Sequence, residues 1–454
     1  MKRLLIIAYH FPPLGGGNIE RSVKFAQYLP SFGIAPIVLT GLPSPQNRTA
    51  REEPPEFEIP ASVRVVRTAW PAGSRAERLR ADQNRLELAA NVIAEERIGA
   101  ILVSMSPFSD AGFAARLSSR CGVPWIADLQ DPWALDEFQI YRTRWHRDRS
   151  LHAMRRALST AALIIMNTPE AAACVGRTFP EFSRRTISIT NGFDAEDLTR
   201  TRAASPNRFF TIVHAGFLHS AAGIRQRRRP WQYRLLGRIE PGVEILPRSH
   251  YYLLQALAQW REQDPSMEER VRFHLLGEVR SIDRELAAHS PVAGLTRFVG
   301  PISRAESSRA VREADLLFLP MHKVAEGKRA SVIPGKTFEY LASGRPILAP
   351  VPEGAARTIL ERAGSALICE PDNIDQMVAH LRTRYAAWLA GKPPPALDLD
   401  YMKRFERREL TKQLATWLDP LIRSAPASTA PTTESLEAIP APPAPPEPAA
   451  ANGY

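Results

Sequence analysis

Short apolar runs recur along this chain, and a stretch of helical character follows most of them. In the first half such runs stand at residues 4–8, 100–104 and 163–166, and they contain almost no polar side chain. A strand with one solvent-exposed face alternates polar and apolar residues, whereas a strand that is buried on both faces does not. The pattern therefore predicts an α/β protein whose parallel sheets carry helices on both faces.

The second half of the chain repeats this pattern. Apolar runs predict strands at residues 210–214, 271–276, 296–299, 315–319, 346–349 and 366–369. A chain of 454 residues is too long for one core, because hydrophobic cores rarely grow past roughly 250–300 residues. We therefore predict two Rossmann-like domains, at 1–198 and 209–400, joined by a polar linker at 199–208. Residues 219–247 break the pattern and are interpreted as an arginine-rich insertion.

Parallel α/β sheets bind their ligands beyond the carboxyl ends of the strands, so the two domains are expected to form an interdomain cleft. A helix at 401–423 is predicted to close the folded part of the chain. The segment 424–454 is rich in proline and alanine and has no core pattern, which predicts a disordered tail.

The formal net charge of +11 favours phosphorylated ligands or anionic lipid as partners. Arginines gather around Trp145 in residues 142–156, which is typical of a helix on an anionic membrane, although a solvated helix face explains the pattern equally well. No nucleic-acid recognition motif accompanies the charge, so nucleic acid is not an expected partner. No apolar stretch is long enough to span a bilayer. The expected location is cytoplasmic, with peripheral contact at the inner face of the cytoplasmic membrane left open.

A glycine-rich loop follows the first predicted strand. It starts at His10 and contains Gly15, Gly16 and Gly17, and a predicted helix follows it. Glycines let backbone N–H groups approach an anion, and a helix N-terminus favours negative charge. Two prolines separate these glycines from the strand and Glu20 stands at the third glycine position of a dinucleotide fingerprint, which disfavours NAD. His10 is a candidate catalytic residue here; a purely structural loop is the alternative reading.

Two carboxylates, Asp128 and Asp131, stand at the end of a predicted buried strand. At this edge of a parallel sheet they can orient an acceptor hydroxyl or accept its proton, so both are candidate catalytic residues. Alternatively, Asp131 caps a helix that starts at Pro132.

The segment 315–349 is the most informative part of the chain. A buried strand is followed by a polar loop and a predicted helix that begins at Pro334, with Ser331 or a neighbour as its cap. Lys336 and Glu339 are one turn apart and share a face. This pair offers a cation for a diphosphate and a carboxylate for two ribose hydroxyls. A solvated Lys–Glu pair is the alternative.

Taken together, four stretches resemble the retaining glycosyltransferases of family 4, which have the GT-B architecture. These stretches read YHFPPLGGGNIERSVKFAQYLPSFG, ADLQDPW, NTPEA…ITNGFD and PGKTFEYLASGRPILAP. The resemblance covers residues 1–423. It implies sugar transfer with retention from a nucleotide-diphosphate sugar to a glycan or lipid-linked acceptor, without a metal or other cofactor. It also implies that the second domain holds the donor, the first holds the acceptor, and the product belongs to a surface polysaccharide or glycoconjugate.

By position, the resemblance assigns Glu339 to the donor ribose and the three loop glycines to the border of the donor phosphate. It places Lys336 and the Gly335 backbone beside the diphosphate, with Arg248 as a further candidate cation. Asp128 and Asp131 match an acceptor-side pair.

Three positions depart from the family pattern. Ser331 stands where the family has the first acid of a paired-glutamate motif. We therefore expect backbone amides near 331–335 to bind the donor sugar instead. Gln130 replaces an arginine, and Gly216 opens the second domain where an Arg…Lys pair is usual. These departures keep two alternatives open: a GT-B sugar-nucleotide epimerase, and a non-catalytic scaffold that binds sugar nucleotides or lipid.

Overall fold

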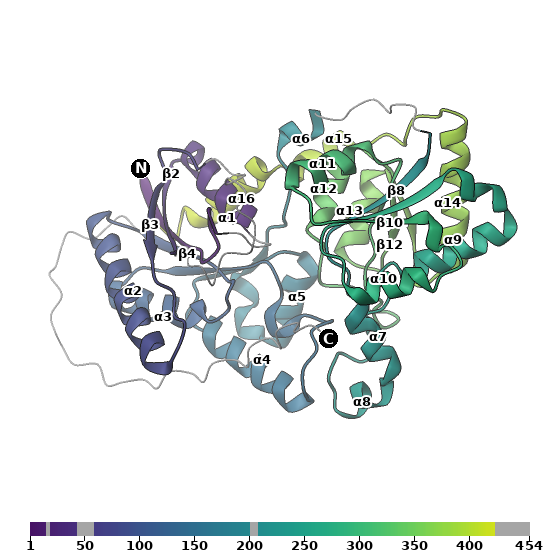
Figure 1. Ribbon diagram of the computed structural model, residues 1–454. Helices are drawn as coiled ribbons and strands as arrows, with labels where there is room; N and C mark the ends of the chain where they lie inside the picture. Colours follow the sequence, from purple (N-terminus) through teal and green to yellow (C-terminus); the bar gives the residue numbers. More distant parts are fainter. Residues whose placement is uncertain (15–18, 43–58, 200–207, 423–454) are drawn as a thin grey trace.

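Two parallel β-sheets, each covered by helices, form the two halves of the protein (Figure 1). The computed structural model describes residues 1–14, 19–42, 59–199 and 208–422. The predicted fold class is therefore confirmed. The predicted linker falls largely outside the described residues, as does the predicted disordered tail.

The first sheet has seven parallel strands and is built from the first half of the chain. Its strands, in spatial order, are β3 (Arg64–Thr68), β2 (Ile34–Gly41), β1 (Lys2–Ile7), β4 (Ala100–Ser104), β5 (Trp125–Leu129), β6 (Leu163–Met166) and β7 (Thr186–Ser188). The helices of this half are α1 (Ile19–Tyr28), α2 (Arg75–Glu95), α3 (Asp110–Cys121), α4 (Arg144–Leu158), α5 (Pro169–Thr178) and α6 (Ala195–Thr199).

Burial on both faces explains why the strands read as unbroken apolar runs. In β1, Leu5 and Ile7 belong to a core with α2, α3 and α5, whereas Leu4 and Ile6 belong to a second core with α1. All four side chains are at most 1% exposed. Successive side chains point to opposite faces of a sheet, so a strand between two cores needs an apolar residue at every position.

The second sheet has six parallel strands. In spatial order they are β10 (Thr296–Gly300), β9 (Val271–Leu276), β8 (Phe210–Ala215), β11 (Leu316–Phe318), β12 (Ile347–Pro350) and β13 (Ala366–Cys369). Its helices are α9 (Tyr251–Gln263), α10 (Ser281–Ala288), α11 (Arg304–Glu313), α12 (Lys336–Ala342), α13 (Ala355–Ala363) and α14 (Ile374–Leu389).

The predicted insertion is structured. It forms α7 (Ser220–Arg228) and α8 (Pro230–Leu235), and its backbone is bonded to the first domain. Tyr141 N–H donates to Arg238 O at 2.7 Å, and Arg144 N–H donates to Leu236 O at 2.7 Å. The insertion therefore bridges the two domains at one end of the cleft.

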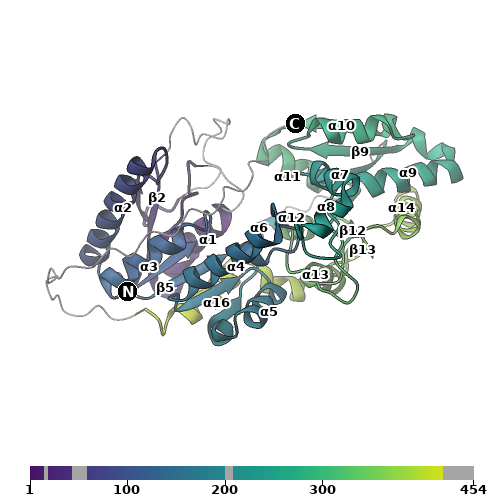
Figure 2. The same cartoon turned by 90° about the horizontal axis from the view of Figure 1, so that it is seen from below.

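The prediction of one closing helix at 401–423 is wrong. The chain forms α15 (Leu399–Met402), a short 3₁₀ turn, and then α16 (Arg407–Leu418) after an extended Glu406. Met402 packs in the core of the second domain, whereas Leu414 packs in a core of the first. Both views show α16 lying with the first domain (Figures 1 and 2). The apolar spacing is helical on both sides of the break, so the sequence pattern hides the change of core.

Candidate active site between the two domains

The carboxyl edges of the two sheets face each other, and a buried carboxylate joins them. Glu137, eight residues after the end of β5, accepts a hydrogen bond from His322 Nε2 at 3.1 Å and from the Ser331 N–H at 2.9 Å. His322 and Ser331 belong to the segment that follows β11 of the second sheet. Burial alone would raise the pKa of Glu137, but the hydrogen bonds from His322 and Ser331 hold it below the ordinary value. The predicted interdomain cleft is thus present.

Ser331 does not cap a helix, contrary to the prediction. Helix α12 begins at Lys336, its N-cap is Gly335, and no side chain caps it. Instead the Ser331 hydroxyl donates to Glu137, and the Ser331 carbonyl accepts from Thr168 Oγ1 at 2.5 Å. A carboxylate from the first domain therefore lies at the position where the sequence lacks one.

A cluster of cationic groups lies at the start of α12. Lys336 Nζ lies 3.1 Å from His214 Nε2, and His214 Nδ1 lies 2.9 Å from Phe318 O. The carbonyl can only accept, so Nδ1 carries the imidazole proton and Nε2 accepts from Lys336. Burial and then the Arg248 guanidinium lower the pKa of Lys336 to about 7. The sequence-predicted residues Arg248 and Lys336 are therefore brought together.

Arg248 has an unused donor. Its Nη1 is buried and has no hydrogen-bond partner in the described part of the chain, and its guanidinium lies 4.6 Å from the centre of the Phe138 ring. Two desolvated cations with an unsatisfied donor form an environment that an anion stabilises, because the anion restores the hydrogen bond and the attraction lost on burial.

Gly216 makes room for this cluster. Its φ of +104° is accessible to glycine, and a Cβ at this position would lie 3.0 Å from Lys336 Nζ. Gly277 follows the neighbouring strand β9 and lies close to the Gly216 backbone. A Cβ added at Gly277 would lie 3.3 Å from the Gly216 Cα. A side chain at 216 would occupy the space beside the lysine ammonium.

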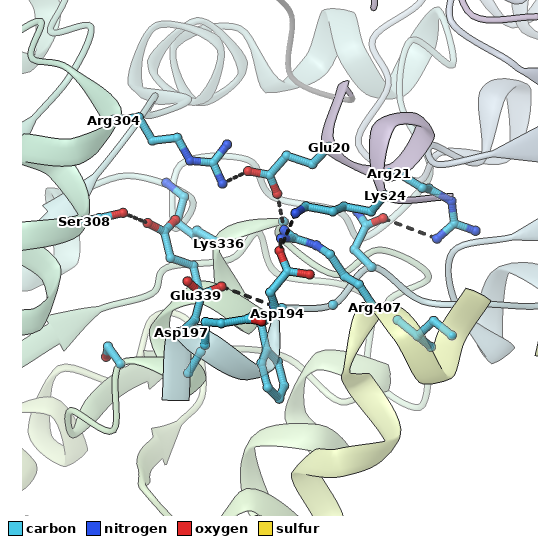
Figure 3. Close-up of a pocket in the computed structure, with 18 of the residues that line it drawn as sticks. Glu20, Arg21, Lys24, Asp194, Asp197, Arg304, Ser308, Lys336, Glu339 and Arg407 are labelled. Carbon is cyan, nitrogen blue, oxygen red and sulfur yellow. Dashed lines mark hydrogen bonds and ion pairs between the residues drawn. The ribbon is translucent and has the colours of Figure 1, made fainter. Parts of the chain in front are cut away.

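A cleft of about 830 Å³ opens beside Lys336, within the range typical of small-molecule sites. Gly335, Lys336 and Glu339 line it, and the predicted sharing of one helix face by Lys336 and Glu339 places both side chains on this cleft. Glu339 is exposed to this space, and its Oε1 accepts from Ser308 Oγ at 3.3 Å (Figure 3). The Arg304 guanidinium lies within electrostatic range of this carboxylate.

Ion pairs join both domains around this cleft. Glu20 of α1 pairs with Arg304 of α11 and with Arg407 of α16. Asp194 in turn pairs with Arg407 at 2.9 Å and with Lys24 at 2.9 Å (Figure 3). The network ties three helices from different parts of the chain to one wall of the cleft.

The structure gives Asp128 a structural role. It is 1% exposed, and Arg21 of α1 binds both of its oxygens, with Nε to Oδ2 at 2.9 Å and Nη2 to Oδ1 at 2.8 Å. Asp128 is therefore buried in an ion pair with Arg21, and its predicted contact with an acceptor hydroxyl stays a prediction. Asp131 is exposed, within electrostatic range of Arg248. His10 is half-buried with its ring against Tyr9 at 4.7 Å.

The loop glycines Gly15, Gly16 and Gly17 lie outside the described residues, so their predicted contact with a donor phosphate stays a prediction.

Sequence reasoning missed several groups at this site. Asp136 and Glu137 follow the ADLQDPW stretch closely, and His214, His219 and His322 follow or end strands of the second sheet. Burial, then the Glu137 charge, raises the pKa of Asp136 to about 8, so this carboxyl can carry a proton near neutral pH. The position of these residues near strand ends could have marked them as candidate site residues. The sequence alone could not show that Glu137 pairs with His322 and Ser331 of the other domain.

The described residues contain no group of three or more His, Cys, Asp or Glu side chains arranged to hold a metal ion. They also contain no helix with the length and apolar character needed to cross a membrane.

Family models match both halves of the chain. Residues 16–192 match a glycosyl transferase 4-like domain, and residues 233–386 match the glycosyl transferases group 1 domain. Together with two parallel Rossmann-like sheets around a cleft, these matches define the class: the chain belongs to the glycosyltransferases of GT-B type.

Individual proteins are similar at low identity. A D-inositol 3-phosphate glycosyltransferase of Geodermatophilus obscurus is 23% identical over 232 residues, which cover 49% of this chain and 46% of that protein. Among solved structures, Anabaena Alr3699/HepE in complex with UDP-glucose has a TM-score of 0.58 at 15% identity, covering 92% of this chain and 100% of that one. WaaG, a glycosyltransferase involved in lipopolysaccharide biosynthesis, has a TM-score of 0.54 at 14% identity, covering 91% and 99%. These structural similarities support the fold.

Proposed function

We propose that this glycosyltransferase is a retaining enzyme of the family 4 type that transfers a sugar from a nucleotide-diphosphate sugar to a glycan or lipid-linked acceptor. The observation that carries the proposal is the buried pair of Lys336 and Arg248 beside a cleft that exposes Glu339. Two desolvated cations suit a diphosphate, and a carboxylate one helical turn from Lys336 suits the two hydroxyls of a ribose.

In this proposal the leaving diphosphate is stabilised by Lys336 and Arg248 and needs no metal ion. Charge that develops on the leaving oxygen meets preformed donors in a site shielded from water. The acceptor hydroxyl attacks from the face that the leaving group departs from. In this proposal Asp136, which lies within electrostatic range of Arg248, exchanges a proton with the acceptor hydroxyl. Activity that disappears with EDTA and returns with Mg²⁺ would contradict the metal-free reaction.

The biological setting follows from the similar proteins rather than from the cleft. WaaG is described as acting in lipopolysaccharide biosynthesis, and the structure of HepE contains UDP-glucose. A role in surface polysaccharide or glycoconjugate synthesis, with a uridine diphosphate sugar as the first donor to test, is consistent with them. Within this proposal the enzyme works in the cytoplasm with peripheral contact to the inner face of the membrane.

Product analysis separates the proposal from its alternatives. The enzyme is incubated with a panel of nucleotide sugars, with and without saccharide acceptors, and released nucleoside diphosphate and sugar products are quantified. Acceptor-dependent release with retained anomeric configuration supports the transferase. A changed sugar epimer in the absence of acceptor indicates an epimerase instead, and donor binding without any turnover indicates a scaffold. Glu339→Ala should abolish turnover, and Glu262→Ala, an exposed carboxylate on α9, serves as the matched control.

A further inference from the structure

A second hollow of about 870 Å³ lies between residues 138–142 of the first domain and the inserted helices α7 and α8. Six arginines line it: Arg142, Arg225, Arg228, Arg229, Arg238 and Arg280. None of the described residues that line it is an aspartate or glutamate. The aromatic rings of Phe138, Tyr141, Phe217 and Tyr233 also line it. We refer to this hollow as the arginine groove.

Five of the six groove arginines form no ion pair among the described residues, whereas Arg280 pairs with Glu278 at 3.5 Å. Arg238 Nε donates to Tyr141 O at 3.2 Å, and Arg225 Nε donates to Ala221 O at 3.3 Å, so both bind neutral carbonyls. Arg142, Arg228 and Arg229 are exposed, and none of them forms an ion pair within the described part of the chain. Guanidinium groups match the geometry of phosphate, and gathering several of them without carboxylates favours a phosphate-bearing ligand.

The inner end of the groove lies beside Arg248. Phe138 lines the groove and also lies beneath the Arg248 guanidinium, and His219 packs edge-on against Phe138 at 5.6 Å between ring centres. Phe217 directly follows Gly216, which lies beside Lys336. A molecule held in the groove therefore extends toward the groups assigned to the donor diphosphate.

The outer end carries exposed apolar side chains. Trp231 and Leu235 lie one turn apart on α8 and are 62% and 78% exposed, and Trp145 at the start of α4 is 60% exposed. The bond from Arg144 N–H to Leu236 O places the start of α4 beside the end of α8. Figure 1 shows α8 projecting from the second domain next to α4. Exposed tryptophan and leucine are costly in water and are typical of surfaces that enter a membrane interface.

Charge around these apolar side chains points to the same partner. Residues 142–149 and 225–240 together contain ten arginines and only two carboxylates, Asp148 and Glu240. Glu240 is already paired with Arg147 at 3.1 Å. Arginines around exposed tryptophan and leucine fit an anionic bilayer, and the aromatic side chains distinguish this surface from a purely electrostatic one.

We propose that the arginine groove binds the phosphate groups of a lipid-linked acceptor, presented by an anionic membrane on which α8 and the start of α4 rest. This inference rests on the proposed transferase function and assigns the acceptor class: a saccharide attached to lipid through phosphate. The insertion then supplies half of the acceptor site, and the first domain supplies residues 138–142.

The test uses the full-length protein and sedimentation with phosphatidylcholine vesicles, with and without phosphatidylglycerol. Wild-type protein should sediment only with the anionic vesicles and should be released by high salt. Each basic residue near an anionic surface contributes roughly fivefold to binding, so Arg228→Gln with Arg229→Gln should weaken binding on the order of tenfold or more. Trp231→Ser with Leu235→Ser should also weaken binding to the anionic vesicles at low salt, because it removes the apolar side chains that enter the membrane interface.

Matched controls remove the same side-chain types elsewhere. Arg80→Gln with Arg120→Gln removes two exposed arginines of α2 and α3, and Trp417→Ser removes an exposed tryptophan of α16. Both controls should sediment like the wild type. Equal losses in control and groove variants would overturn the proposal, because they would indicate binding through net charge alone. An absence of sedimentation would overturn it as well.

A competition experiment with a soluble phosphate compound tests whether the groove binds phosphate on a lipid or free phosphate in solution. Glycerol phosphate, added at the phosphate concentration of the vesicles, should leave vesicle binding nearly unchanged. Complete displacement would overturn the lipid assignment and indicate a soluble phosphorylated acceptor. Nucleotide-sugar binding to the wild type without vesicles is measured separately, so a failure at the groove is distinguishable from a failure of the transferase proposal.

Discussion

Replacing Lys336 with methionine should stabilise the ligand-free protein while weakening diphosphate binding. The ammonium is desolvated and lies close to Arg248, and both effects lower its pKa from the ordinary 10.5 to about 7. Between about pH 7 and 10.5, Lys336 is therefore protonated in the unfolded chain but largely neutral in the folded protein, so the unfolded state binds more protons. Stability therefore rises with pH between about 7 and 10.5, and the lysine lowers stability most at and below pH 7.

The magnitude follows from that shift. A change from 10.5 to about 7, at roughly 1.4 kcal/mol for each pH unit, gives an upper limit of about 4–5 kcal/mol for the destabilisation caused by the charge. Partial solvent screening and the lost contact with His214 reduce the gain, so Lys336→Met is expected to raise the free energy of unfolding by about 1–3 kcal/mol at pH 7. For a domain of this size each kcal/mol corresponds to roughly 2–4 °C in Tm.

The same variant should bind nucleoside diphosphates at least tenfold more weakly, because a charge-assisted hydrogen bond to phosphate contributes about 1.5–3 kcal/mol. Thermal unfolding and isothermal titration calorimetry with UDP at pH 6, 7 and 9 measure both effects. The stability difference between variant and wild type should shrink toward pH 9. A variant that is less stable than wild type at pH 7, or that binds UDP equally well, would refute the reasoning.

Three further predictions concern the framework of the site. Glu137→Gln should lower the free energy of unfolding by about 2–4 kcal/mol in urea denaturation, because it leaves His322 and Ser331 in a buried site without their carboxylate; unchanged stability would argue against this interdomain contact. Gly216→Ala should weaken diphosphate binding in calorimetry, because its φ is +104° and its Cβ would lie 3.0 Å from the lysine ammonium; wild-type affinity would contradict this. Asp128→Asn should cost about 3–5 kcal/mol of stability in the same denaturation assay, since it leaves a buried arginine unpaired, and a loss confined to activity would restore Asp128 as a catalytic candidate.

Much of the fold was predictable because both sheets are buried on two faces. The runs at 163–166, 271–276 and 366–369 coincide with β6, β9 and β13. Continuous apolar runs report burial directly, so they need no knowledge of which strands are neighbours. The break between α15 and α16 was missed for the same reason: the pattern reports that residues are buried, but it does not report in which core.

The site was only partly predictable. Lys336 and Glu339 share a helix face through local geometry alone, and the structure places both on the cleft. Glu137 bonds Ser331 across 194 residues of chain, a contact that local spacing cannot reveal. Asp128 looked like a site residue because of its place at a strand end, but the partner that buries it, Arg21, lies on a distant helix. Charge alone did not distinguish a buried ion pair from an acceptor-binding carboxylate.

The central claim is that the cleft beside Glu339 holds a nucleotide-sugar donor. It is tested most directly by thermal shifts without metal, using UDP, GDP, ADP, TDP and CMP and their sugar conjugates on the wild type and on Glu339→Ala. A ligand at a hundredfold excess over its Kd should stabilise the protein by about 2.7 kcal/mol. The account predicts that one nucleotide stabilises the wild type and that the shift disappears in Glu339→Ala. A shift that persists in the variant, or the absence of a shift with every nucleotide, would contradict it.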